Sequence, residues 1–158
     1  MTDEVKQPGR DATVSLREIT KETLRPFLKM KVAESQNNMV ANNAVSIAQA
    51  HFEPHAWFRG IYADEMPVGF IMLYDDPDEP VYFLWRLLVA EEYQGLGYGR
   101  KAVDQLVAYV KTRPNATELK VSHVKELPGN PGPFYEKLGF EYTGEEDGGE
   151  LVMSLRLS

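Results

Sequence analysis

The stretch LLVAEEYQGLGYGRKAV, residues 87–103, decides the interpretation of the whole chain. It begins as an apolar run typical of a buried strand, and it resumes after a short loop with the spacing of a helix. Between them, Gly95, Gly97 and Gly99 leave backbone N–H groups uncovered at the positive end of the helix dipole. This arrangement predicts a binding site for an anion such as a phosphate, to which Arg100 adds a positive charge.

The well-known phosphate-binding loops do not fit this stretch. A Rossmann fingerprint requires G-x-G-x-x-G, but the sixth position counted from Gly95 is Arg100. No window of the chain supplies the G-x-x-x-x-G-K-[ST] of a P-loop. The local pattern is instead Q-x-x-G-x-G, from Gln94 to Gly99, and a tight turn without any ligand is the simpler alternative.

The composition predicts one compact domain over residues 13–158, preceded by a flexible tail over residues 1–12. The 158 residues are 43% hydrophobic and 26% charged, which is ordinary for a globular domain. No apolar run approaches the roughly 18 residues of a membrane span, and residues 1–10 lack the apolar centre of a signal peptide. We therefore expect a cytoplasmic protein without a membrane partner. Because the chain has no cysteine, disulfides and thiolate chemistry are excluded.

Charge and histidine spacing exclude two further classes of function. With 17 basic and 24 acidic residues the net charge is -7, which argues against a nucleic-acid partner and weakly favours cationic ones. Acidity that only maintains solubility is the alternative. His51 and His55 are four residues apart, but Pro54 interrupts a helix there and a third ligand is lacking nearby, so we expect no metal site.

Periodicity predicts an α/β fold in which helices cover a mixed sheet. The expected order is a strand, two helices, three strands, a helix, a strand, a helix and two strands. Thr20 is expected to cap the first helix, whose apolar positions extend to Val32. The strands are expected at residues 13–19, 56–63, 68–74, 81–90, 118–124, 140–143 and 150–157, and the helices at 20–32, around 47–48, after 99 and at 132–138.

Two motifs together resemble the GNAT superfamily of acyl-CoA-dependent N-acetyltransferases. They are the Q-x-x-G-x-G loop between an apolar strand and a helix, and PFYEKLGF at residues 133–140. The segments GFIMLY, LWRLLV and YQGLGYGR look most like the bacterial spermine/spermidine acetyltransferases. The resemblance implies a mostly antiparallel sheet of about seven strands whose central strands splay apart, with four helices. It also implies that acetyl-CoA is the acyl donor.

The same resemblance implies where coenzyme A binds. The loop from Gln94 to Arg100 is expected to hold the pyrophosphate, and the strand backbone around Leu88 and Val89 to pair with the pantetheine arm. Asn130 is included although its loop departs from the family pattern, and it would otherwise cap the following helix. The complete set expected at the cofactor is Leu87, Leu88, Val89, Gln94, Gly95, Leu96, Gly97, Tyr98, Gly99, Arg100, Asn130 and Phe134.

Acetyl transfer to an amine needs an unprotonated amine, a donor to the oxyanion and a proton for the departing thiolate. Tyr135 matches the tyrosine that serves as general acid in relatives, although on spacing alone it is an ordinary core aromatic. The backbone N–H of Val89 is expected to stabilise the oxyanion. The base is open: Glu34 is the first candidate, Glu53 and Asp75 follow, and a water-mediated route is an alternative.

The acceptor is expected to be a primary amine of a small molecule, with a polyamine as the first class. Phe83 and Trp85 lie on one strand face and are expected to wall the acceptor pocket together with Gln36. The eukaryotic polyamine acetyltransferases carry a glutamate at the position that aligns with Trp85, and this chain lacks it. A non-catalytic acyl-CoA-binding regulatory domain, and acetylation of an antibiotic, an amino acid or a protein N-terminus, remain alternatives. A homodimer is common in the superfamily.

Overall fold

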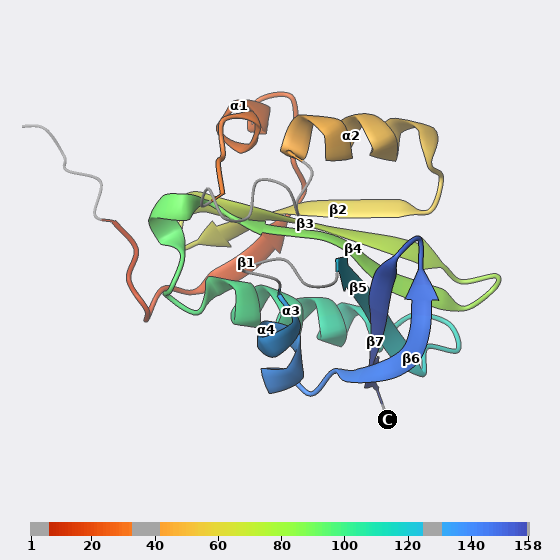
Figure 1. The fold of residues 1–158 in the computed structure, drawn as a ribbon. Helices are drawn as coiled ribbons and strands as arrows, with labels where there is room; N and C mark the ends of the chain where they lie inside the picture. Colours follow the sequence, from red (N-terminus) through yellow and green to blue (C-terminus); the bar gives the residue numbers. More distant parts are fainter. Residues whose placement is uncertain (1–6, 33–41, 125–130, 158) are drawn as a thin grey trace, which may run out of the picture.

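A computed structural model describes residues 7–32, 42–124 and 131–157. Seven strands form one sheet in the order β1-β2-β3-β4-β5-β7-β6 (Figure 1). Neighbouring strands are antiparallel except β4 and β5, which run parallel. The expected mixed sheet and its order of elements are therefore confirmed. The strands are β1 Val14–Arg17, β2 Ala56–Ala63, β3 Met66–Asp76, β4 Val81–Val89, β5 Glu118–Val124, β6 Glu141–Asp147 and β7 Glu150–Arg156.

In the part of the chain that the structure describes, four α-helices cover the two faces of the sheet. The helices α1 Leu24–Leu28 and α2 Asn43–Phe52 lie on one face, and α3 Tyr98–Val110 and α4 Gly132–Lys137 lie on the other (Figure 1). The larger apolar core lies under α3, and a smaller one is centred on Phe70, Met72 and Leu88. Every described helix is too short or too polar to cross a membrane.

Strand β4 is apolar on both faces because it separates the two cores, and a bulge at Trp85 shifts its alternation. Met72 pairs with Arg86 and Leu73 pairs with Leu84, so Trp85 is an extra residue in β4. As a result Leu84 and Leu87 both contact the larger core, although three positions separate them.

The parallel contact between β4 and β5 is short. In the described residues it comprises only Phe83 opposite Lys120 and Leu84 opposite Val121. Beyond these pairs the two strands separate, as the family resemblance implied. The backbone of β4 from Leu87 to Val89 remains paired on its other side with β3.

The first helix is shorter than the sequence predicted. It ends at Leu28 rather than near Val32, and Thr23 rather than Thr20 occupies the N-cap position. The Thr20 N–H donates a hydrogen bond to Thr23 Oγ1 at 2.8 Å. The Lys31 carbonyl accepts from the Glu91 N–H at 2.7 Å, so a tertiary contact replaces the continuation of the helix.

Strand β6 extends further than the expected residues 140–143. It continues to Asp147, opposite Glu150, because Gly148 and Gly149 make the turn alone with φ values of 57° and 85°. The acidic residues directly before this turn therefore lie in a strand and not in a loop; they are Glu145, Glu146 and Asp147.

Residues 7–12, the described part of the expected tail, contact the start of α3. Tyr98 Oη donates to the Gly9 carbonyl at 2.7 Å, and Lys101 Nζ donates to the Arg10 carbonyl at 2.7 Å. Ala12 is only 7% exposed. This segment is consequently part of the folded structure.

We expect Gly60→Ala to lower the free energy of unfolding by about 1–3 kcal/mol, because overpacking strains a filled core. A Cβ at residue 60 would lie 2.7 Å from Phe27 Cε1, and the Phe27 side chain is fully buried. Gly9→Ala is the control, since a Cβ there meets nothing within 4 Å. Urea unfolding of both variants measures the difference, and an equal effect at the two positions would contradict this account of the Gly60–Phe27 contact.

Candidate functional site

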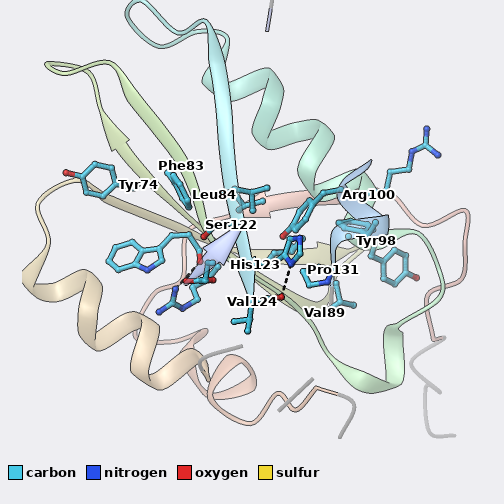
Figure 2. Close-up of a pocket in the computed structure, with 18 of the residues that line it drawn as sticks. Tyr74, Phe83, Leu84, Val89, Tyr98, Arg100, Ser122, His123, Val124 and Pro131 are labelled. Carbon is cyan, nitrogen blue, oxygen red and sulfur yellow. Dashed lines mark hydrogen bonds between the residues drawn. The ribbon is translucent and has the colours of Figure 1, made fainter. Parts of the chain in front are cut away.

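A cleft of about 1260 Å³ runs along β4, between the start of α3 and the turn that joins β6 to β7. Figure 2 shows Tyr98 and Arg100 at one end and Tyr74 at the other, with His123 and Pro131 between them. The separation of β4 from β5 makes room for this cleft. One continuous space therefore joins the glycine loop to the aromatic residues of β4.

The glycine loop leads from the end of β4 into α3. Gly95 and Gly97 have φ values of 79° and 84°, in the left-handed region that favours glycine. Gln94 Nε2 donates to the Val89 carbonyl at 2.9 Å, which ties the loop to the end of β4. The first turn of α3 begins at Tyr98, so its backbone N–H groups and the helix dipole favour an anion at this end of the cleft.

Tyr135, on α4, lines the cleft. It is 5% exposed, and its ring lies 5.2 Å from Phe134 and 5.5 Å from Phe140 between ring centres. A Cβ at Gly99 would lie 3.4 Å from Phe134 Cζ, so α4 packs closely against the start of α3. Burial raises the pKa of Tyr135 well above its ordinary value, so the phenol holds its proton at neutral pH.

The far end of the cleft is lined by aromatic rings, as expected for Phe83 and Trp85. Trp85 meets Tyr74 edge to face, with 6.5 Å between ring centres. The Arg86 guanidinium lies 5.5 Å from the centre of the Trp85 ring. These contacts form a wall that can pack against the methylenes of a ligand.

Several charged or polar residues of the cleft were not expected there, among them Arg86, Glu150 and His123. Arg86 stands out in the sequence as a cation within an apolar strand, and its side chain lines the cleft. Glu150 is the first residue of β7, directly after the glycine turn, and this turn lies beside the cleft. No local sequence pattern indicates that position. His123 is 5% exposed and also lines the cleft. Its Nδ1 donates to the Val124 carbonyl, and its Nε2 is 2.9 Å from Tyr142 Oη.

The other expected residues divide into three groups. Most of the proposed cofactor set lines the cleft, namely Leu87, Val89, Gln94, Gly95, Gly97, Tyr98, Gly99, Arg100 and Phe134. The Leu88 side chain is buried in the smaller core and Leu96 packs against the larger one, so neither side chain faces the cleft. Glu34, Gln36 and Asn130 lie outside the described residues.

The two secondary candidates for a base have other contacts. Asp75 accepts hydrogen bonds from Tyr109 Oη at 2.9 Å and from Arg113 Nε at 3.0 Å, which joins β3 to α3. Glu53 accepts from the His55 N–H at 3.1 Å, after the end of α2. Neither residue lines the cleft. Within the described residues, no group of three potential ligands is placed to hold a metal ion.

Comparison with known proteins agrees with this geometry. The sequence profile of the Acetyltransferase (GNAT) family matches residues 15–140. A spermine/spermidine N(1)-acetyltransferase of Bacillus subtilis is 26% identical over 149 residues, covering 89% of this chain and 97% of the relative.

Solved structures share the fold at lower identity. The PaiA N-acetyltransferase of Thermoplasma acidophilum, in complex with coenzyme A, has a TM-score of 0.68 and 17% identity over 91% of this chain and 99% of its own. An aminoglycoside 6'-acetyltransferase type Ii has a TM-score of 0.70 and 17% identity, with coverage of 92% and 97%.

We expect the buried phenol of Tyr135 to make stability depend on alkaline pH. An unfolded tyrosine loses its proton near pH 10, whereas the raised pKa keeps Tyr135 protonated in the folded state. Its contribution is complete below pH 10 and is lost as the pH rises from there toward the folded pKa. Above pH 10, the free energy of unfolding of the wild type should fall more steeply than that of Tyr135→Phe, by up to about 1.4 kcal/mol per pH unit. Denaturant unfolding at pH 8, 10 and 11 measures this, and parallel slopes would show that Tyr135 is not shielded from water.

Proposed function

The chain belongs to the GNAT acetyltransferase family, and from that premise we propose that it transfers an acetyl group from acetyl-CoA to a primary amine of a small molecule. The observation that carries the proposal is the single cleft that joins the glycine loop, the separated part of β4 and Tyr135. We assign this activity to one domain formed by residues 13–158.

In this proposal the cleft holds acetyl-CoA along its length. Backbone N–H groups of the loop from Gln94 to Arg100 bind the pyrophosphate, helped by the Arg100 charge and the dipole of α3. The pantetheine amides pair with the backbone from Leu87 to Val89, where β4 has left β5. The ring of Phe134 packs against the ligand between these two regions.

The chemical step is a direct attack within a ternary complex. The amine nitrogen forms a bond to the thioester carbon, and the Val89 N–H stabilises the oxyanion. The C–S bond then breaks, and the Tyr135 hydroxyl gives its proton to the CoA sulfur. The ammonium first loses one proton to Glu34 or to water, and the nitrogen loses a second proton as the amide forms. Water carries this second proton back to the Tyr135 phenolate. Its position in the cleft supports this role of Tyr135, because a proton donor must reach the ligand.

A polyamine is one acceptor class compatible with this proposal. The name of the 26% identical Bacillus subtilis relative supports it, as do two carboxylates that line the cleft, Asp147 and Glu150. Phe83 and Trp85 would pack against the methylenes of the acceptor. Gln36 and Asn130 keep their proposed roles, in acceptor and CoA binding respectively.

We expect thiol release from acetyl-CoA to depend on an added amine. The panel contains spermidine, spermine, an aminoglycoside and amino acids, each assayed with wild type and with Tyr135→Phe. The variant should lose on the order of a hundredfold in kcat, because it lacks the proton donor. Its affinity for CoA, measured by calorimetry, should remain within about threefold, since the removed hydroxyl is not needed to bind the nucleotide end.

The same assay distinguishes an enzyme from a regulatory domain. A chain that binds CoA but releases no thiol with any amine would favour the regulatory alternative. A Tyr135→Phe variant with unchanged kcat would remove Tyr135 from the proposed mechanism.

We expect Gly97→Ala to weaken CoA binding by about tenfold or more, because a Cβ would stand where the phosphate approaches the backbone. Gly144→Ala is a matched control. The two glycines have φ values of 84° and 86°, and a Cβ meets nothing within 4 Å at either one. Both variants should therefore lose a similar stability of roughly 1–2 kcal/mol. Calorimetry that finds equal CoA affinity in the two variants would contradict a phosphate site at the loop.

A further inference from the structure

Arg86 is a cation in the middle of an apolar central strand. The sequence of β4 is VYFLWRLLV, and Arg86 follows the bulged residue Trp85. Its guanidinium is held from two sides: Nη1 donates to the Trp85 carbonyl at 3.0 Å, and Nη2 donates to Gln49 Oε1 on α2 at 3.2 Å. The charge is therefore fixed in position, and the side chain lines the cleft at its acceptor end.

The environment of Arg86 is unfavourable for a cation in the absence of a ligand. Arg86 Nε is buried and has no hydrogen-bond partner within the described part of the chain. Burial lowers the pKa of Arg86, although a guanidinium still remains protonated at neutral pH. Such an unpaired buried donor is destabilising by itself, so packing alone gives a poor account of this residue.

Glu150 places a negative charge near Arg86 without neutralising it. Its charge acts on Arg86 and raises the pKa, against the larger effect of burial. The ion pairs formed among the described residues do not include Arg86 with Glu150. Both residues line the cleft, and Asp147 lines it beside Glu150. The acceptor end therefore presents one fixed cation and separate carboxylates.

We propose that the acceptor carries an anionic group, such as a carboxylate, close to its amine, and that Arg86 binds this group while Glu150 and Asp147 face the amine. The inference rests on the proposed acetyl transfer and narrows the acceptor to amino-acid-like zwitterions. A guanidinium matches a carboxylate through paired N–H donors. A polyamine carries no anion, so it would bring further positive charge to Arg86 and leave the guanidinium without a counter-ion.

Matched acceptor pairs that differ only in the carboxylate test this inference. L-lysine is compared with cadaverine, L-ornithine with putrescine and L-phenylalanine with phenethylamine, each by kcat/KM from thiol release. We expect the wild type to prefer the carboxylate in at least one pair by about tenfold or more, as for a charged hydrogen bond. In Arg86→Gln that preference should fall to about threefold or less, and Arg86→Lys should retain part of it.

Arg59→Gln is a matched control variant. Arg59 Nη1 also donates to the carbonyl of the preceding residue, at 2.7 Å, and its guanidinium also lies over a tryptophan, 4.4 Å from the Trp57 ring centre. It does not line the cleft. The carboxylate preference should therefore be the same in Arg59→Gln as in the wild type. CoA affinity, measured by calorimetry in every variant, verifies that the fold is intact.

The outcomes separate this inference from the proposed function. Turnover of amines with no carboxylate preference, or a preference that survives in Arg86→Gln, would overturn the role of Arg86 and leave acetyl transfer standing. If CoA binds but no amine in the panel reacts, the role of Arg86 is tested by calorimetry of L-lysine and cadaverine binding to the CoA complex. Tighter binding of lysine that is lost in Arg86→Gln supports the inference, and equal binding overturns it. Failure to bind CoA would overturn both proposals.

Discussion

The cleft depends on the early separation of two parallel strands. After two paired positions, β4 and β5 diverge, and the strand that carries Leu87 to Val89 continues beside β3 alone. Buried backbone N–H and C=O groups require partners, so a separated central strand is costly unless something else pairs with it. The Gln94 side chain satisfies one such group, the Val89 carbonyl, at the end of the strand. A ligand with its own amides can pair with the other backbone N–H and C=O groups of this part of β4. The proposed site therefore follows from the architecture of the sheet as well as from the glycine loop.

The bulge at Trp85 changes which side chains of β4 face the larger core and which face the cleft. Because one extra residue shifts the alternation, Leu84 and Leu87 both contact the larger core. Without it, strict alternation would place these two leucines on opposite faces. The bulge also lies directly before Arg86, whose guanidinium then bonds to the Trp85 carbonyl and to Gln49. Bulges frequently redirect side chains beside binding sites, and here the redirected residue is the only arginine of β4.

Features set by local chemistry were predictable from the sequence, and features set by contacts between distant segments were not. The three glycines after an apolar run correctly indicated a loop that leads from a strand into a helix, and the apolar periodicity gave the correct order of elements. The end of α1 depends on a hydrogen bond between Lys31 and Glu91, sixty positions apart in the chain. The bulge at Trp85 is defined by its pairing with β3, and Glu150 reaches the cleft only through the turn before β7. The apolar pattern of β4 indicated burial but did not reveal which neighbours would face Arg86.

The net charge of the chain is a poor guide to its acceptor because charge acts locally in a cleft. A net charge of -7 favours cationic partners in solution. Inside the cleft, however, the guanidinium of Arg86 lies 5.5 Å from the centre of the Trp85 ring, and partly buried charges are screened less than exposed ones. The electric field of the whole protein can attract amines from solution, whereas short-range contacts within the cleft determine which amine binds. On that physical ground the presence of Arg86, Glu150 and Asp147 in one cleft says more about the acceptor than the net charge of the chain does.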